Sequence, residues 1–116
     1  MTYGDAEAQC KSDGSFLAIP RSEAENDFIA SLIPKEHIWI GINDIEQEGS
    51  FVAVDGREIS WTNWGTGEPN GDANENAVEI RTNFGNVWND IPASSSLKFV
   101  CSLNIEGSIK GQSRTT

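Results

Sequence analysis

The sequence is poor in the residues on which zinc sites and nucleophilic catalysis depend. Its 116 residues include one histidine, His37, and two cysteines, Cys10 and Cys101. The cysteines form no Cys-x-x-Cys pair and no cluster with the histidine, which argues against a zinc site. A single histidine also leaves no credible Ser-His-Asp or Cys-His set. His37 is expected to be a surface residue just before a strand.

Basic residues and long apolar runs are scarce as well. Eight Lys and Arg stand against 18 Asp and Glu, a net charge of −10. Because such a surface repels phosphate backbones, we expect no nucleic-acid partner. No apolar run approaches the roughly 18 residues of a membrane span, so we expect no membrane insertion. Residues 1–5 lack the pattern of a signal peptide, as in a mature chain or a fragment. The acidity fits either a solvated surface or a cation site.

The sequence does contain enough apolar residues for one domain with one core. Its hydrophobic content is 37%, with four Trp and five Phe. The two cysteines fit either free buried thiols of a cytosolic protein or one bridge between the first helix and the last strand. By loop-entropy reasoning, so long a bridge would stabilise the fold by about 4–5 kcal/mol.

Two helices are predicted near the start of the chain. The first covers residues 2–12, where Thr2 caps the helix and Asp5 is at the third helical position. The second starts at Ser22, which forms a capping box with Glu25. Each helix has one predicted inner face: Tyr3, Ala6 and Cys10 in the first, and Ala24, Phe28, Ile29 and Leu32 in the second.

Short strands are predicted after the helices, so the order indicates an α+β fold with mostly antiparallel pairing. Asp55 and Gly56 are typical of a hairpin turn, and Val78 and Ile80 point to one side of their strand. Residues 62–76 form a long loop, and residues 104–116 are a polar tail that we expect to be disordered. Strands are predicted over residues 16–19, 38–42, 50–54, 57–61, 77–81 and 98–103. Trp39, Trp61 and Trp88 are expected to pack in the core and at the loop base, and Trp64 is left open.

The long loop contains the stretch GEPNGDANEN, residues 67–76, which gathers carboxylate and amide oxygens. Hard cations prefer such ligands, and Ca²⁺ takes about six to eight of them. Pro69 stiffens the chain between Glu68 and Asn70, and a cis Glu68–Pro69 bond would turn both side chains toward one point. Two further oxygen groups are Asn89 with Asp90, and Asp44 with Glu46 and Glu48. For any one group, the alternative is an ordinary solvated turn.

Several motifs occur in a characteristic order along the chain. They are Phe-Leu-Ala-Ile-Pro-Arg at 16–21, Trp-Ile-Gly-Ile at 39–42, Trp-Thr-Asn-Trp at 61–64, Glu-Pro-Asn at 68–70, and Trp-Asn-Asp at 88–90 followed by Cys101. Each motif alone is weak, but the ordered set with compatible spacing resembles the C-type lectin domain, nearest to the mannose-binding collectin type. The resemblance covers residues 1–103.

The resemblance implies a principal Ca²⁺ site in the long loop. In the family, the ion binds two vicinal sugar hydroxyls, each of which donates to a carboxylate and accepts from an amide N–H. This explains the mixture of acids and amides, because acids alone would offer no donor. The Glu-Pro-Asn order is the type that favours mannose, glucose, N-acetylglucosamine and fucose over galactose. The implied ligands of both ion and sugar are Glu68, Asn70, Glu75, Asn89 and Asp90.

A second Ca²⁺ site is also implied, with a weaker ligand set. Asp44 and Glu48 match its first two ligands, and the long loop adds Asp72 and Asn76. Asn76 replaces an acid of the family. Because a neutral amide binds Ca²⁺ more weakly than a carboxylate, this site is expected to be weak or empty.

The resemblance also implies a disulfide between Cys10 and Cys101, and the chain departs from the family in two ways. A second, short disulfide would join the positions of Ala77 and Ala93, and both are alanine. We therefore expect the binding loop to depend more on Ca²⁺ for its order. The strand that usually precedes the first helix is missing, so residues 1–103 are expected to form a C-type lectin domain without its first strand.

The function implied is Ca²⁺-dependent carbohydrate binding, with glycans of cell surfaces or glycoproteins as partners and a secreted or extracellular location. One small, exposed site binds a monosaccharide weakly, so homo-oligomers would supply avidity. One alternative is a protein-binding or ice-binding module of the same fold, but such relatives usually lose the ligands present here. Another is a glycosidase using Glu68 and Glu75, roughly 5–9 Å apart. A bound cation would hold both carboxylates charged, so we expect no enzyme.

Overall fold

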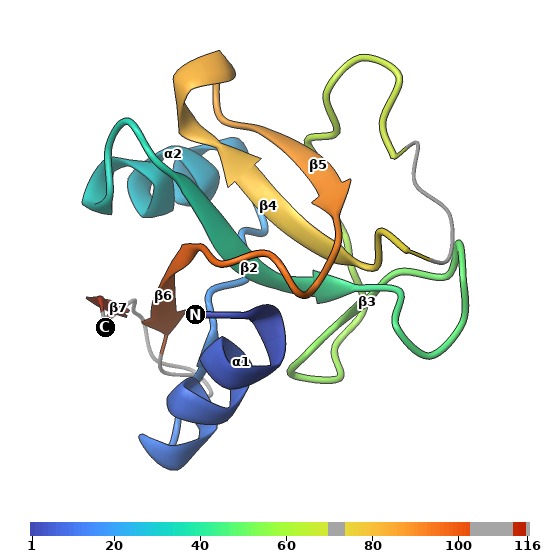
Figure 1. The fold of residues 1–116 in the computed structure, drawn as a ribbon. Helices are drawn as coiled ribbons and strands as arrows, with labels where there is room; N and C mark the ends of the chain where they lie inside the picture. The colour runs from blue at the N-terminus through green and yellow to red at the C-terminus, as the bar shows by residue number, and fades with distance from the viewer. Residues whose placement is uncertain (70–73, 103–112, 116) are drawn as a thin grey trace.

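The structure of the chain, a computed structural model, describes residues 1–69, 74–102 and 113–115 (Figure 1). The two predicted helices and most of the predicted strands are present. Neither described helix is long and apolar enough to span a membrane. The elements are α1 (Tyr3–Ser12), β1 (Phe16–Leu17), α2 (Glu23–Leu32), β2 (His37–Asn43), β3 (Val52–Ala53), β4 (Ala77–Arg81), the 3₁₀ turn η1 (Thr82–Phe84), β5 (Val87–Ile91), β6 (Lys98–Ser102) and β7 (Ser113–Thr115).

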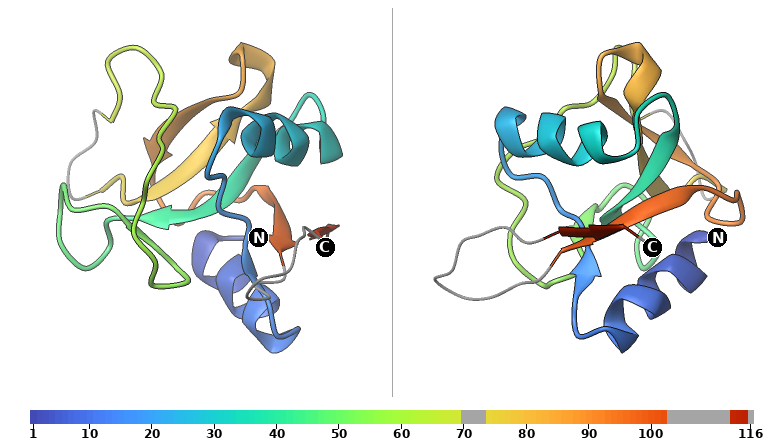
Figure 2. Two further views of the ribbon diagram at one scale, coloured as in Figure 1. Left: turned by 180° about the vertical axis from the view of Figure 1, so that it is seen from behind. Right: turned by 90° about the vertical axis from the view of Figure 1, so that its left-hand side faces the viewer.

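The strands form one sheet in the order β1-β6-β2-β4-β5, with β3 added to β2 and β7 added to β6. β2 and β6 run parallel, and the other described strand pairs are antiparallel. Alternate residues of β2 enter two apolar clusters, with Ile38 and Ile40 in one and Trp39 in the other. α2 joins the first cluster and α1 the second, so the helices lie on opposite sides of β2 (Figure 2). The predicted α+β fold is confirmed.

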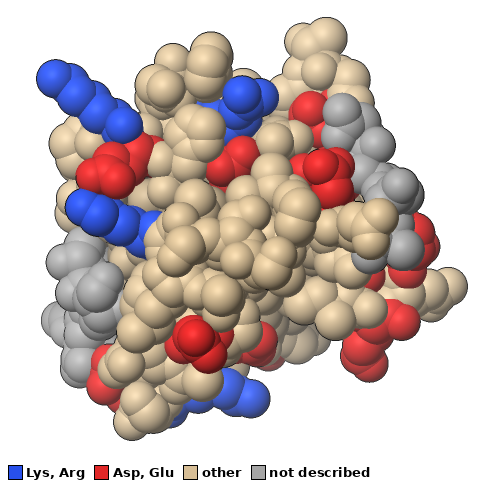
Figure 3. All heavy atoms as spheres, in the orientation of Figure 1, with Lys and Arg blue, Asp and Glu red and all other residues tan. Residues whose placement is uncertain are grey.

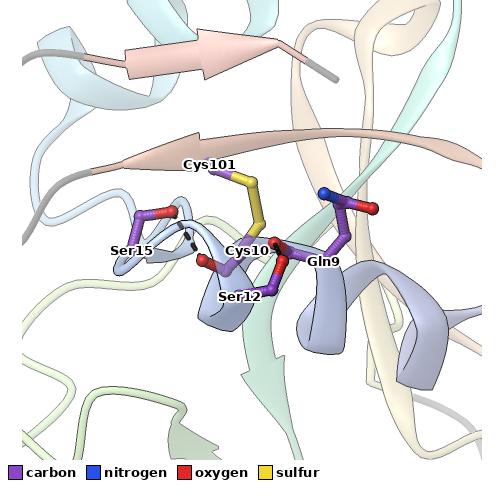
Figure 4. The surroundings of a disulfide bond; sticks show 5 residues. All are labelled: Gln9, Cys10, Ser12, Ser15 and Cys101. Carbon is purple, nitrogen blue, oxygen red and sulfur yellow. Dashed lines mark hydrogen bonds between the residues drawn. A yellow bond between two sulfur atoms is a disulfide. The ribbon is translucent and has the colours of Figure 1, made fainter.

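α1 forms as predicted and is tied covalently to the sheet. The Thr2 hydroxyl accepts a hydrogen bond from the Asp5 N–H, and the predicted inner face is fully buried. Cys10 is bonded to Cys101 of β6, so the alternative of free thiols is wrong. Figure 4 shows this bond next to the last turn of α1, where the Ser15 hydroxyl donates to the Cys10 carbonyl at 2.9 Å.

α2 begins at the predicted cap but buries a different face. Asn26, Ile29 and Ala30 are buried, whereas Ala24 is exposed and Phe28 is 52% exposed. The prediction was wrong for Ala24 and Phe28, because the helix turns a polar residue inward. The Asn26 amide forms two hydrogen bonds: Oδ1 accepts from the buried Nε1 of Trp88 at 2.8 Å, and Nδ2 donates to the part-buried Asn86 carbonyl at 2.8 Å.

The predicted hairpin around Asp55 and Gly56 is present as a turn but lacks its second strand. β3 pairs with β2, and residues 57–61 are not a strand. The Gly56 N–H closes the turn on the Ala53 carbonyl at 3.0 Å. The Asp55 carboxylate accepts from Arg21 at 3.1 Å and from the Arg57 N–H at 3.0 Å, so the exit from the turn is held by a side chain.

The segment predicted to be a disordered tail also differs in part. Ser113–Thr115 forms β7, which pairs with β6 in the register Val100↔Thr115 and Ser102↔Ser113. Backbone pairing of this kind does not need apolar side chains, so composition gave no signal for it. The rest of that segment, like Leu103, lies outside the described residues.

Candidate functional site

Most of the predicted ligands come from three segments at one end of the sheet, and Asn89 and Asp90 come from β5. We call residues 43–51, 62–69 and 74–77 the loop end; it lies on the right of Figure 1 and on the left of the first view in Figure 2. The segment after β2 is joined directly to the segment before β4, because the Asp44 N–H donates to the Asn76 carbonyl at 3.1 Å. This bond places Asp44 and Asn76 side by side, and the grouping of Glu48, Glu68 and Glu75 with them into a site stays a prediction.

Trp88 anchors the base of the long loop. Its ring centre lies 5.7 Å from that of Trp61 and 5.6 Å from that of Trp64, both in edge-to-face contact. Its backbone also holds the loop, because the Trp88 N–H donates to the Asn63 carbonyl at 2.8 Å and its carbonyl accepts from the Gly65 N–H at 3.0 Å. Trp39, Trp61 and Trp88 pack as predicted, and Trp64, which was left open, packs here as well.

The Glu-Pro segment follows this base directly. The Glu68 N–H donates to the Gly65 carbonyl at 2.9 Å, and the Glu68–Pro69 peptide bond is cis. The side chains of Glu68 and Glu75 are half-buried. Two other predicted ligands, Asn70 and Asp72, lie outside the described residues.

Asn89 and Asp90 are placed by the pairing of β4 and β5. Asn89 lies opposite Glu79 and Asp90 lies opposite Val78. Because side chains alternate along a strand, the two predicted ligands leave β5 on opposite faces near its end. Asp90 is 1% exposed, and the Nδ2 of Asn89 donates to Oε2 of Glu79 at 3.1 Å.

Asp44 has the environment expected of a cation ligand. Its side chain is 1% exposed, and Oδ2 accepts from the Gly49 N–H at 2.8 Å. Its other oxygen, Oδ1, is buried and accepts no hydrogen bond within the described residues. A buried carboxylate oxygen is costly unless a positive group or a donor compensates it. The residues present therefore fit a divalent cation at the second predicted site.

The donor set as a whole is made of hard oxygen ligands. Within residues 1–69 and 74–102, no three Asp, Glu, His or Cys side chains are arranged to hold a metal ion by themselves. The predicted sites instead combine carboxylates with asparagine oxygens, a combination that suits Ca²⁺. In Figure 3, acidic side chains gather on the right, over the loop end, whereas the Lys and Arg side chains visible in that view lie toward the left and middle.

Sequence reasoning missed two residues that support this region. Asn26 joins α2 to Trp88, and its distant partners give no signal in the helix pattern. Glu79 is a buried acid that contacts Asn89, and His37, expected as a bare surface residue, lies 2.9 Å from it. The register of the hairpin formed by residues 77–81 and 87–91 would have placed Glu79 opposite Asn89.

The strand order, the helices on opposite sides of the sheet and the long loop define the class of fold. The family model of the lectin C-type domain matches residues 1–103, and the chain belongs to this family. Over 104 residues the chain is 40% identical to Collectin-10 of Xenopus tropicalis. The match covers 85% of this chain and 37% of that protein, so the chain spans little more than a third of its relative.

Solved structures share the fold but differ in what they do. The cow C-type carbohydrate-recognition domain of CD23, solved in the presence of a GlcNAc2Man3 oligosaccharide, is 30% identical with a TM-score of 0.79, over 87% of this chain and 78% of that chain. A calcium-independent type II antifreeze protein is 26% identical with a TM-score of 0.81, over 87% and 77% of the two chains. The fold is therefore established, and the function must be argued from the site.

Proposed function

We propose that this domain binds carbohydrates in a Ca²⁺-dependent manner through the loop end. The observation that carries the proposal is the buried carboxylate of Asp44, which is 1% exposed and lies in the region where other predicted acids and amides gather. Buried carboxylates need compensating positive charge, and the Oδ1 of Asp44 accepts no hydrogen bond from the described residues. A cation bound between the loops would supply that charge.

The residues of the principal site would divide the work between ion and sugar. Glu68, Asn70, Glu75, Asn89 and Asp90 would hold Ca²⁺, which when bound coordinates two vicinal hydroxyls of the sugar. The carboxylates accept hydrogen bonds from those hydroxyls and the amide N–H groups donate to them. Asp44, Glu48, Asp72 and Asn76 would hold a second, weaker ion that steadies the loop.

The Glu-Pro-Asn order of residues 68–70 supports a preference for mannose, glucose, N-acetylglucosamine and fucose. The oligosaccharide present with the cow CD23 domain and the likeness to Collectin-10 support a glycan ligand in general. The family match supports a binding role and not catalysis. Glycans of cell surfaces or glycoproteins are the proposed partners, and several copies of the chain would give useful avidity.

The disulfide supports a secreted or extracellular location. Bonds such as Cys10–Cys101 form and persist in oxidising compartments and are rare in the cytosol. The same compartments hold Ca²⁺ at concentrations that weak sites can use.

Retention on mannose-agarose in the presence of Ca²⁺, followed by elution with a chelator, tests the proposal. We expect retention with Ca²⁺, release on chelation, and little retention on galactose-agarose. Retention that survives chelation would contradict the mechanism. In a matched specificity test, Glu68→Gln with Asn70→Asp should move the preference toward galactose, and unchanged mannose binding would show that the site lies elsewhere.

The likeness to the calcium-independent antifreeze protein supports a second candidate, an ice-binding module. Thermal hysteresis measured with and without chelator separates the two. A carbohydrate-binding domain should give no hysteresis under either condition, whereas chelator-resistant hysteresis without mannose binding would favour the second candidate.

A further inference from the structure

Glu79 is a buried acid in the middle of the sheet. It lies between Val78 and Ile80 in β4 and is 3% exposed, on the face opposite to these two apolar side chains. A carboxylate in such a place is costly unless charged or hydrogen-bonding groups surround it. The groups that contact the Glu79 carboxylate therefore explain how the buried acid is accommodated.

Three groups surround the Glu79 carboxylate. Nδ2 of Asn89 donates to Oε2 at 3.1 Å, Nδ1 of His37 lies 2.9 Å from Oε1, and Nε of Arg81 lies 4.0 Å from Oε2. The His37 nitrogen is within ion-pairing distance of Oε1, but no described donor meets Oε1 with hydrogen-bonding geometry. The one hydrogen bond among these three contacts therefore goes to Asn89, a predicted Ca²⁺ ligand.

The chemistry of this bond sets the orientation of the Asn89 amide. A carboxylate accepts hydrogen bonds and does not donate them, so the nitrogen of the amide must face Glu79. The carbonyl oxygen, Oδ1, then faces away from Glu79. The register Glu79↔Asn89 places the two side chains directly across from each other, so the contact follows from the strand pairing.

We propose that Glu79 is a positioning residue, which holds the amide of Asn89 with its oxygen available to the cation and its nitrogen turned away. This inference rests on the proposed function. One N–H of Asn89 is given to Glu79, and the second remains for a sugar hydroxyl. Without Glu79 the amide can turn over and present its nitrogen to the cation. His37 and Arg81 also lie close to the carboxylate, at 2.9 Å from Oε1 and 4.0 Å from Oε2.

The test compares two substitutions with a matched control in the full chain. Glu79→Met removes the acceptor at similar volume, whereas Glu79→Gln keeps an oxygen that can accept from Asn89. Glu36→Gln is the control, because Glu36 makes an exposed ion pair with Lys98 at 2.9 Å and touches no predicted ligand. The measurements are Ca²⁺ affinity by calorimetry, the melting temperature without Ca²⁺, and the NMR signals of the Asn89 side-chain amide.

Loss of a group that orients a metal ligand typically weakens metal binding by about 10–100-fold, which is the loss expected for Glu79→Met. Glu79→Gln should lose less, and Glu36→Gln should match the wild type. A purely structural role would lower the melting temperature of the Ca²⁺-free protein and leave the Ca²⁺ affinity of the folded protein unchanged, which would overturn the inference.

The Asn89 amide signals keep the inference testable if Glu79→Met does not fold. In the Ca²⁺-free wild type, one N–H of this amide should carry the signature of a bond to a carboxylate, and Glu79→Gln should shift it. An unchanged signal would overturn the inference. If the wild type binds no Ca²⁺ although the amide signal responds to Glu79→Gln, the orientation stands, and both the proposed function and the role of Asn89 as a ligand fail.

Discussion

The two ends of this domain are held together by different forces. At one end, α1, β1 and β6 are joined by the Cys10–Cys101 bond and by a fully buried cluster that includes Tyr3 and Leu17; we call this the disulfide end. In and beside the loop end, two carboxylates are buried, Asp44 after β2 and Asp90 in β5, while Phe51 and Trp64 pack against the apolar cluster around Trp88. The disulfide end is held by a covalent bond and apolar packing, whereas the loop end contains a buried oxygen, Oδ1 of Asp44, that accepts no hydrogen bond within the described residues.

The alanines at the positions of the family's second disulfide strengthen this contrast. Ala77 is buried in the same cluster as α1, and Ala93 packs against it. The Ala93 carbonyl accepts a hydrogen bond at 3.0 Å from the N–H of Tyr3, the first residue of α1. A hydrogen bond therefore connects Ala93 to the disulfide end. Without a second covalent link, the start of β4 depends on pairing and on whatever binds between the loops.

The largest expected effect comes from breaking the disulfide end. Replacing both Cys10 and Cys101 by alanine should lower the free energy of unfolding by about 2–5 kcal/mol, because the unfolded chain regains the entropy of a long loop. Urea denaturation in saturating Ca²⁺ measures the loss. The Ca²⁺ affinity of the protein that remains folded should change little, and a large loss of affinity would mean that the two ends are not independent.

A smaller effect is expected from Asn26→Ala at the base of the long loop. The substitution leaves the buried Nε1 of Trp88 without its partner, at a cost of about 1–3 kcal/mol for a buried unsatisfied group, whereas the Asn86 carbonyl still accepts from Nδ2 of Asn63. Urea denaturation checks the value. Asp27→Ala, an exposed change in the next residue of the helix, serves as the control and should stay within about 0.5 kcal/mol of the wild type. Equal effects of the two would contradict the anchoring role of Asn26.

Asp44→Asn should act in opposite directions with and without Ca²⁺. Without Ca²⁺ the melting temperature should not fall, because the change removes an uncompensated buried charge. At saturating Ca²⁺ the protein should gain less stability than the wild type, by about 1.4 kcal/mol for a tenfold weaker site. Calorimetric melting checks both, with Glu46→Gln on the same loop as the control. A fall in stability without Ca²⁺ would mean that Asp44 has a compensating partner within the protein.

Short-range sequence signals were enough to predict much of the structure of the disulfide end. Contacts between residues far apart in the sequence explain the prediction errors elsewhere. The caps at Thr2 and Ser22 depend on residues three positions away, and both were predicted correctly. The inner face of α2 was mispredicted because Asn26 bonds to Trp88, 62 positions away. The strand after Asp55 was mispredicted because that acid pairs with Arg21, 34 positions away.

The candidate site was predicted from motifs, which gave no indication of the residues that support it. The roles of Asp44, Asn89 and Asp90 as ligands stay predictions, and Asn70 and Asp72 lie outside the described residues. Glu79 escaped notice because an acid inside a strand looks like an ordinary exposed residue until the strand is paired. Strand pairing places Glu79 opposite Asn89 and next to His37. This proximity cannot be predicted from any of the three residues considered separately.

Hydrogen exchange measured with and without Ca²⁺ tests the contrast between the two ends most directly. Because a bound cation would compensate the buried carboxylate of Asp44 and join the loops, Ca²⁺ should slow exchange in residues 43–51, 62–76 and 88–90. It should leave exchange in α1 and β6 nearly unchanged. Protection spread equally over both ends, or no protection of the loop end at saturating Ca²⁺, would contradict the account.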